Sequence, residues 1–243
     1  MMIRAKYTKT GHLVYLSHLD LVRLFERAFR RAAIPLAFTQ GFNPHPMISF
    51  AAPLSVGISS VSEYVEVVLA EAIDLTAFMT LINETLPDDI QILAAVQKDE
   101  KTTSSLMQEA ALMDYRLFFR LENPLPDQQL TEQITRFLSR DQIIIFKKAK
   151  SLKAKNRSGK PSKQKPVDVL PLIKSFQLVN NETALTELHL SIHVINQETV
   201  KPILILEKWL QENNLTIRKA TLMIERREIY RLDSHREYVS MIL

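Results

Sequence analysis

Residues 3–33 read IRAKYTKTGHLVYLSHLDLVRLFERAFRRAA, in which a strand pattern gives way to a helix pattern. Apolar and polar side chains alternate from Ile3 to Thr8, which predicts a half-buried strand. Ser17, followed three residues later by Asp20 just before an apolar run, predicts the start of a helix over 18–33. The apolar residues of this helix recur at helical spacing and form one buried stripe: Leu21, Leu24, Phe25, Ala28 and Ala32.

The same kinds of signal continue to residue 97. Leu13–Leu16 reads as a short return strand or an extended lead into the helix. Further strands are predicted over 47–52, 63–69 and 90–96, and a second helix over 75–86 behind a cap at Asp74. The resulting order βαββαβ is typical of the ferredoxin-like fold.

A polar stretch at 98–111 reads as a linker, after which the same order is expected to repeat. Strands are expected at 115–121, 143–147, 187–194 and 217–225, an extended segment at 167–176, and helices at 128–138 and 198–211, with Trp209 in the core. We therefore predict an α+β protein of two tandem ferredoxin-like domains, 1–97 and 112–243, with a basic loop at 147–165 in the second.

Composition excludes several classes of protein. The chain has 243 residues of which 46% are hydrophobic, enough for real cores, and no apolar run long enough for a membrane span. It begins without a signal-peptide pattern and has no cysteine, so disulfides, thiolate zinc sites and cysteine-held iron–sulfur clusters are excluded. We expect a cytoplasmic protein that contacts no membrane and holds no cofactor.

Positive charge is concentrated in one segment. Lys147–Lys165 reads KKAKSLKAKNRSGKPSKQK and holds nine of the 31 Lys and Arg residues, which leaves 22 basic against 27 acidic residues elsewhere. Such a segment should be solvated and should attract polyanions such as RNA, although a solubilising loop without a ligand has the same composition. The candidate RNA contacts are Lys147, Lys148, Lys150, Lys153, Lys155, Arg157, Lys160, Lys163 and Lys165.

The first predicted helix carries a row of arginines along its length. Asp20 precedes Arg23 by three residues and Glu26 precedes Arg30 by four, so intrahelical pairs account for part of the row. Arg27 and Arg31 have no such partner. The face formed by Arg23, Arg27 and Arg31 is either solvated or contacts phosphate or carboxylate groups.

Beyond this helix, Gly41-Phe-Asn-Pro-His-Pro46 forms a restricted, extended loop, because a residue before proline avoids the helical region. We expect this loop to pack near the start of the helix and form one polar pocket. Its members would be Ser17, His18, Asp20, Gly41, Phe42, Asn43 and His45. The alternative is that the helix cap at Ser17 and the 41–46 loop are two separate structural features that do not meet.

The histidines of the first third of the chain support few catalytic or metal-binding roles. Adjacent positions in one turn exclude a triad of Ser17, His18 and Asp20, so His18 and His45 are candidates only for general acid–base roles. His12, His18 and His45 lack the spacing of a metal site, and we predict none. Phosphate-cradling glycine loops are also missing.

Several motifs resemble those of the radical-SAM-linked proteins, a bacterial family of unknown function. The shared stretches are Tyr15-Leu-Ser-His-Leu-Asp20, Arg30-Arg31, Gly41–Pro46, Pro53-Leu-Ser-Val-Gly57 and Ser62-Glu-Tyr-Val65, and more weakly Val167-Asp-Val-Leu-Pro-Leu-Ile173. Members of that family occur alone or fused behind a cobalamin-binding radical-SAM enzyme, and are often encoded near ribonuclease and ribosomal-protein genes. The resemblance implies an accessory role to a radical-SAM protein, on RNA.

Three functions therefore remain open. The leading hypothesis is a non-catalytic RNA-binding adaptor that presents tRNA or rRNA to a radical-SAM partner. The predicted tandem architecture is also similar to that of CRISPR repeat-processing enzymes, which suggests a metal-independent endoribonuclease using His18 or His45. A protein–protein scaffold without RNA binding is the third.

Overall fold

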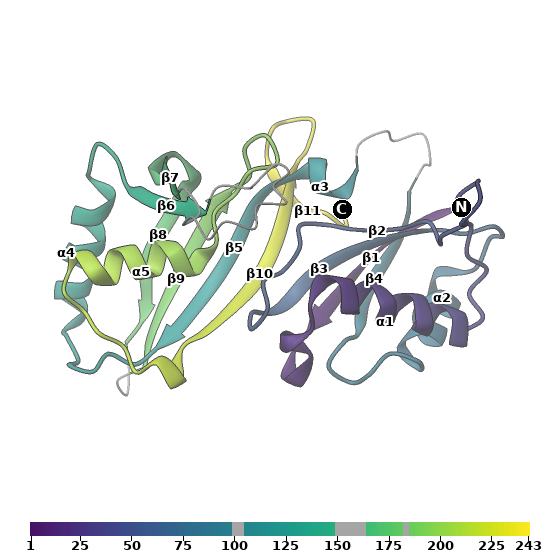
Figure 1. Ribbon diagram of the computed structural model, residues 1–243, viewed down its shortest axis with the longest axis horizontal. Helices are drawn as coiled ribbons and strands as arrows, with labels where there is room; N and C mark the ends of the chain where they lie inside the picture. Colours follow the sequence, from purple (N-terminus) through teal and green to yellow (C-terminus); the bar gives the residue numbers. More distant parts are fainter. Residues whose placement is uncertain (99–104, 149–163, 182–184) are drawn as a thin grey trace, which may run out of the picture. The chain divides into compact units, whose positions relative to one another are not determined.

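The computed structural model describes residues 1–98, 105–148, 164–181 and 185–243 and shows a mixed α+β architecture with a large mixed sheet (Figure 1). The α+β class predicted from the sequence is therefore confirmed. The helices are α1 (His18–Arg31), α2 (Leu75–Asn83), α3 (Leu106–Glu109), α4 (Asp127–Leu138) and α5 (Pro202–Glu212). The strands are β1 (Met2–Lys9), β2 (Ile48–Phe50), β3 (Ser59–Val68), β4 (Ile92–Lys98), β5 (Ala110–Phe119), β6 (Ile144–Lys148), β7 (Gln164–Asp168), β8 (Ile173–Asn180), β9 (Thr186–His193), β10 (Met223–Leu232) and β11 (Tyr238–Ser240).

The chain forms two compact units whose bounds differ from the predicted domains. Unit 1 comprises 1–117, 194–198 and 223–243, and unit 2 comprises 118–193 and 199–222. The difference arises because β10, expected to close the second domain, pairs in parallel with β3 through Glu225↔Ser59 and Arg226↔Ser60. Part of the expected linker is also structured, since α3 and the start of β5 lie within it and Leu106 is buried. Residues 99–104 lie outside the described residues.

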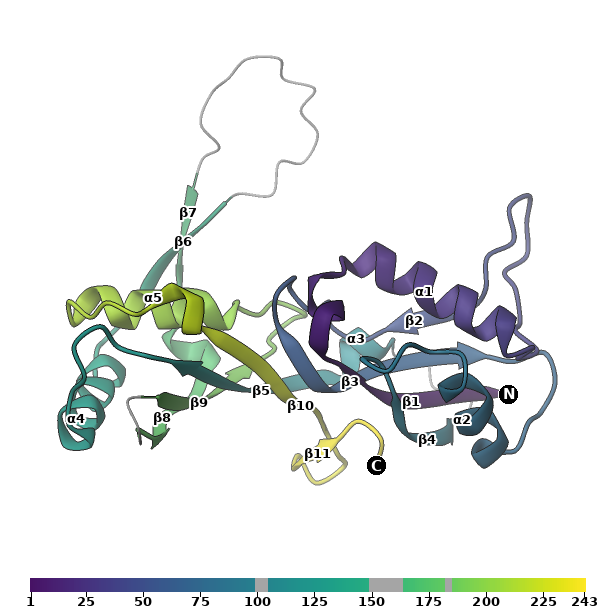
Figure 2. The ribbon, with the colours of Figure 1, turned by 90° about the horizontal axis from the view of Figure 1, so that it is seen from below.

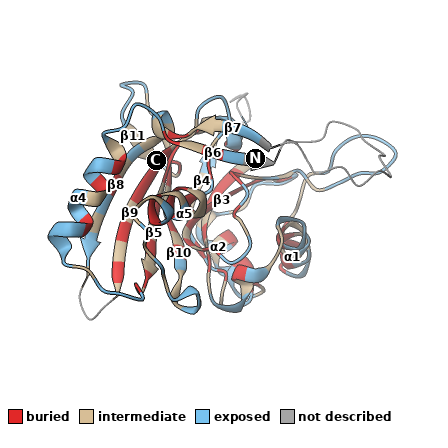
Figure 3. Cartoon of the chain, turned by 60° about the vertical axis from the view of Figure 1, so that its left-hand side comes forward, coloured by how far each residue is buried: buried red, intermediate tan, exposed pale blue. Residues whose placement is uncertain are grey.

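In unit 1, β1 runs antiparallel to both β3 and β4, and β2 pairs antiparallel with the end of β3. Helices α1 and α2 pack on one face of these strands. The Tyr7 and Phe25 rings meet edge to face at 4.9 Å between centroids, and Phe29 stacks on Phe78 at 6.1 Å. Figure 3 shows buried residues gathered along the strands. This apolar core is what the periodicity of the first third of the chain predicts.

Helix α1 begins where the sequence predicts. The Ser17 side chain accepts a hydrogen bond from the Asp20 backbone N–H at 3.2 Å, so the predicted cap is confirmed. The Asp74 carboxylate caps α2 in the same way, at 2.9 Å from the Thr76 N–H. The segment before α1 differs from the expected return strand. Gly11–Tyr15 is a short 3-10 helix, and its Gly11 has a φ of +50°, which favours glycine.

Strand β1 is more buried than predicted, because its outward face carries a buried cation. Arg4 is 1% exposed, and its guanidinium donates to Glu66 on β3 at 2.7 Å and to Glu109 on α3 at 2.8 Å. The same side chain donates to the Met241 carbonyl oxygen at 2.9 Å. Arg4 thereby joins β1, β3, α3 and the C-terminal segment within unit 1.

Unit 2 has its own aromatic core. Strands β8 and β9 pair antiparallel, and the Phe176 ring of β8 meets the rings of Phe137 on α4 at 6.1 Å and Trp209 on α5 at 5.7 Å. Trp209 is fully buried, as predicted. Strands β6 and β7 form a separate two-stranded ribbon that projects from this unit (Figure 2). The predicted extended segment at 167–176 is thus divided between β7 and β8. Among the described residues, every helix is too short or too polar to cross a lipid bilayer.

Candidate functional site

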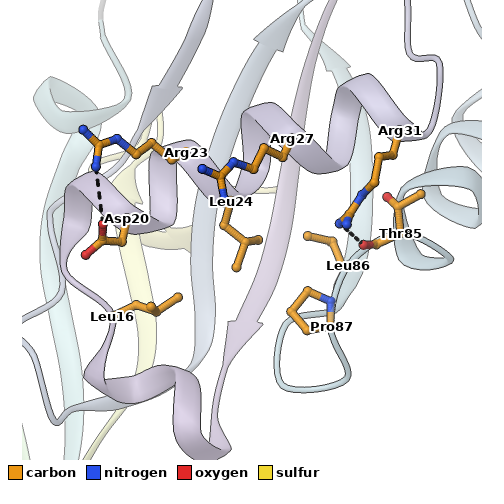
Figure 4. Close-up of a pocket in the computed structure, with 9 residues that line it drawn as sticks. All are labelled: Leu16, Asp20, Arg23, Leu24, Arg27, Arg31, Thr85, Leu86 and Pro87. Atoms are coloured by element: carbon orange, nitrogen blue, oxygen red, sulfur yellow. Dashed lines mark hydrogen bonds and ion pairs between the residues drawn. The ribbon is translucent and has the colours of Figure 1, made fainter.

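A groove of about 610 Å³ runs along α1 in unit 1 (Figure 4). Its walls come from α1 on one side and from the segment that follows α2 on the other. The residues that line it are Leu16, Asp20, Arg23, Leu24, Arg27, Arg31, Thr85, Leu86 and Pro87. The three arginines predicted to share one face therefore line a single groove.

The alignment of these arginines follows from helix geometry. Arg23, Arg27 and Arg31 are separated by four residues each, and an α-helix rises about 1.5 Å per residue, so their Cα atoms follow one another at roughly 6 Å intervals. All three side chains are exposed, while Phe25 and Ala28 in the apolar stripe of the same helix are fully buried. The arginine row lies along the edge of the apolar stripe, so the arginine side chains stay in solvent while the stripe packs in the core.

The three guanidinium groups differ in their partners. Arg23 Nη1 lies 3.7 Å from Asp20 Oδ1, with both side chains more than half exposed, and Arg31 Nη2 donates to the Thr85 carbonyl oxygen at 2.7 Å. Among the described residues, none forms a hydrogen bond or ion pair with the Arg27 side chain. With three cations and one carboxylate, the lining has a net charge of about +2, and Arg27 keeps its full donor set for a ligand.

The floor of the groove is apolar. Leu16, Leu24, Leu86 and Pro87 line it, and Leu86 is 7% exposed. The Thr85 hydroxyl donates to the Ala28 and Ile82 carbonyl oxygens at 3.2 and 3.0 Å, which fixes the segment after α2 against α1. Cations above an apolar floor suit a ligand that has anionic groups along one side and ring or ribose faces on the other.

The predicted composite pocket does not form, and this expectation was wrong. The 41–46 loop has its base beside Val68, because the Ala37 N–H donates to the Val68 carbonyl oxygen at 2.9 Å, and Val68 pairs with Met2 at the start of β1. The start of α1 instead lies at the end of β1, where Lys9 Nζ donates to the Leu16 carbonyl oxygen at 2.9 Å. At about 3.3 Å per residue, the eight residues of β1 separate these places by roughly 23 Å.

Figure 2 shows the same separation, with the loop leaving the end of α1 farthest from its N-terminus. Helix α1 runs back along β1, so the chain leaves the helix near the beginning of the strand and reaches the loop through residues 32–40, in which Leu36 pairs with Leu69 just after β3. Ser17, His18 and Asp20 therefore stand apart from Gly41, Phe42, Asn43 and His45. Only Asp20 of this set lines the groove.

Both candidate histidines are exposed but separated. The His18 ring packs edge to face on Phe50 at 5.6 Å between centroids. In the 41–46 loop, the His45 backbone N–H donates to Thr39 Oγ1 at 3.0 Å and its carbonyl oxygen accepts from the Thr39 N–H at 2.9 Å. Within the described parts of the chain, no group of three His, Asp or Glu side chains is placed to hold a metal ion.

The basic segment begins and ends in the β6–β7 ribbon. The backbone pairs Lys147 with Lys165 and Lys148 with Gln164, and the adjacent pair is Phe146 with Pro166. Phe146 is 63% exposed and Lys165 is exposed. The other candidate contacts Lys150, Lys153, Lys155, Arg157, Lys160 and Lys163 lie outside the described residues.

The sequence reasoning missed one wall of the groove. The sequence pattern places Thr85 and Leu86 at the end of the helix predicted over 75–86, directly before Pro87. No local signal marks them as partners of α1, because their role depends on the packing of α2 beside α1. A search confined to charged residues could not find them.

Comparisons with known proteins place the chain in a family without assigning an activity. A family model described as "Uncharacterized protein conserved in bacteria (DUF2344)" matches residues 2–202. Among curated proteins, none matches the chain. A chain in a solved structure titled "Crystal Structure of a Cbf5-Nop10-Gar1 Complex" is similar at 8% identity with a TM-score of 0.48, over 95% of this chain and 50% of that chain. The protein thus spans about half the length of the solved chain.

Proposed function

We propose that this chain, which belongs to the bacterial family of uncharacterized conserved proteins (DUF2344), is an RNA-binding accessory protein. The observation that carries the proposal is the groove along α1, where Arg23, Arg27 and Arg31 stand above an apolar floor. A guanidinium group donates two parallel hydrogen bonds to a phosphate, and it remains charged at any physiological pH. The groove therefore favours a phosphate-bearing partner.

The spacing of the arginines supports a polymer over a single anion. The Cα atoms of successive arginines follow one another at about 6 Å along the helix axis, a separation comparable to that of neighbouring phosphates on one nucleic-acid strand. One small anion could contact one or two of the three groups, while a strand could contact all of them. Bases or riboses of the same strand would then lie on Leu24 and Leu86.

The basic segment at 147–165 supplies a second reason to favour a polyanion. Its nine Lys and Arg residues would neutralise phosphates without sequence preference and raise the affinity for any RNA. The exposed Phe146 ring beside the Lys147 and Lys165 pair adds a surface on which a base could stack.

The finer parts of the proposal rest on sequence motifs. We infer a radical-SAM enzyme as the partner and tRNA or rRNA as the RNA, on the resemblance carried by the 15–20 and 41–46 motifs. The chain has no cysteine, so a cysteine-held cluster would have to come from the partner. We also infer a ferredoxin-like core for residues 1–97, supported by the neighbours β4-β1-β3 and the pairing of β2 with β3.

The decisive experiment compares two arginines of the same helix. Arg27→Gln removes a cation from the groove, while Arg30→Gln removes one from an exposed position on α1 that does not line it. Fluorescence anisotropy with a labelled tRNA should show Arg27→Gln binding about tenfold more weakly, which corresponds to ~1.4 kcal/mol for a lost charge-assisted contact. Arg30→Gln should change the affinity by less than about twofold.

Other outcomes would replace the proposal. Equal losses for both variants would mean that only net charge matters and that the groove is not the site. No binding of any RNA at physiological salt would favour a protein–protein scaffold. Metal-independent cleavage of the RNA, abolished by His18→Ala or His45→Ala, would favour the endoribonuclease.

A further inference from the structure

A second pocket of about 250 Å³ lies wholly within unit 2, and its lining carries no charged side chain. Five of its residues are carboxamides. The residues that line it are Asn123, Leu125, Gln129, Gln133, Asn213, Asn214, Leu215 and Thr216. This composition is the opposite of the arginine groove and calls for a different ligand.

Three segments build the pocket. Gln129 and Gln133 lie one turn apart on α4, so their amides reach the same side of the helix. The segment between β5 and α4 and the segment after α5 are joined by a hydrogen bond from the Glu122 N–H to the Thr216 carbonyl oxygen at 2.9 Å. Asn214 has a φ of +52°, which lets the chain turn sharply after α5. The walls are therefore fixed by backbone contacts.

One amide in the pocket is incompletely satisfied. Gln133 Oε1 is buried and has no hydrogen-bond partner among the described residues. Buried acceptors are normally paired, because an unpaired one loses its water without gaining a partner. The Asn213 amide, in contrast, is oriented by its donation to the Trp209 carbonyl oxygen at 2.8 Å. The pocket thus offers a ligand one amide fixed by its own fold, while Gln133 Oε1 itself is closed off from the pocket in this arrangement.

The chemistry of the lining narrows the ligand. With no Lys, Arg, Asp or Glu in the lining, an ionic group would enter without compensation, which disfavours phosphates, carboxylates and amines. Paired donors and acceptors of Asn and Gln match the edges of nucleobases, as they do in adenine recognition. The volume lies just below the roughly 300–1,000 Å³ of pockets for drug-sized ligands, so it suits one heterocycle.

We propose that this pocket binds the hydrogen-bonding edge of a single unpaired nucleobase through the carboxamides that line it, Gln133 among them. The proposal deepens the RNA-binding function and rests on it for the source of the base. The arginine groove would hold phosphates of any sequence, whereas the amide pocket would distinguish one base from another.

Nucleosides test this proposal without the contribution of phosphate. The full-length protein is titrated separately with adenosine, guanosine, cytidine and uridine, and with ribose as the sugar control, while amide NMR signals are followed. We expect one nucleoside to shift signals of residues 123–133 and 213–216 in a saturable way, and ribose to leave them unchanged. Gln133→Leu should weaken this binding at least tenfold.

The matched control lies on the same helix. Gln128 donates to Glu132 at 2.9 Å on the exposed side of α4 and does not line the pocket, so Gln128→Leu should bind the nucleoside as the native chain does. If Gln133→Leu fails to fold, Asn123→Ala serves as the test variant. Absence of saturable shifts with all four nucleosides, or equal shifts with ribose, would overturn the proposal.

The two functional proposals can fail separately. Arg27→Gln should leave nucleoside binding unchanged, because Arg27 belongs to unit 1. Tight tRNA binding without any nucleoside binding would refute the base pocket alone. Nucleoside binding in a protein that binds no RNA would support the base pocket and refute the RNA-binding function alone.

Discussion

Arg226 on β10 donates through Nη1 to both carboxylate oxygens of Glu63 on β3, each at 3.0 Å, and both side chains are buried. The same nitrogen donates to the Ala52 carbonyl oxygen at 3.0 Å, and Nε donates to the Tyr115 hydroxyl at 3.3 Å. Burial by itself lowers the pKa of Arg226, but the charge of Glu63 together with Tyr115 and Tyr7 outweighs this effect, so the guanidinium pKa is raised. The pair anchors β10 in unit 1, although the sequence places that strand in the second half.

Removing this cation should strongly destabilise unit 1. Arg226→Met leaves the Glu63 carboxylate buried without its partner, and such a loss costs about 3–5 kcal/mol. Urea unfolding followed by circular dichroism measures it. The control is Arg227→Met, because Arg227 is half exposed and pairs with Glu225 at the surface, where about 0.5 kcal/mol or less is expected. Equal losses of unfolding free energy for the two variants would show that the buried Arg226–Glu63 pair stabilises the protein no more than the surface pair does.

Arg4 should hold the C-terminal segment in place. Its guanidinium donates to the Met241 carbonyl oxygen at 2.9 Å while the same group binds Glu66 and Glu109. Arg4→Met removes this donor, so backbone amides of residues 238–243 should exchange with deuterium faster, by roughly tenfold for each ~1.4 kcal/mol of lost local stability. Unchanged exchange in 238–243, measured by mass spectrometry on a folded variant, would contradict the assignment.

His193 gives unit 2 a pH-dependent stability. Burial, and then the positive charge of Lys174, lowers the pKa of His193 below its ordinary value. The unfolded chain therefore binds a proton at a higher pH than the folded chain, so stability is complete above about pH 6.5 and falls as the pH drops from there. His193→Gln should reduce the loss of urea resistance between pH 8 and pH 5, and Lys174→Met should reduce it partly. A native chain equally stable at both pH values would refute this.

Elements that depend on local signals were predictable. The start of α1 follows from Ser17 and Asp20, which lie within one turn, and the apolar stripe follows from spacing along the same helix. The arginine row was predictable for the same reason, since residues four apart on a helix always share a face. The groove itself was not, because Thr85 and Pro87 approach α1 only after α2 has packed.

Elements that depend on distant partners were not predictable. A strand was expected at 217–225, but β10 begins at Met223, and its parallel pairing with β3 starts at Glu225 opposite Ser59. Arg4 lies on the polar side of its predicted strand and Arg226 lies just beyond the end of its predicted strand, and only carboxylates far along the chain allow their burial. The prediction of the composite pocket was wrong for the same reason, because the path of α1 along β1 decides where the 41–46 loop lies.

The basic segment should contribute more than the groove to the salt dependence of RNA binding. Replacing its central Lys and Arg residues by Gln (Lys150, Lys153, Lys155, Arg157, Lys160 and Lys163) removes up to six phosphate contacts. Each lost contact should flatten the plot of log affinity against log salt by about 0.7–0.9, so the slope should fall by several units on every RNA tested. Arg27→Gln should flatten it by about one contact only. A slope unchanged by the six replacements, measured from 50 to 300 mM salt, would leave the segment outside the binding site and assign RNA affinity to the groove alone.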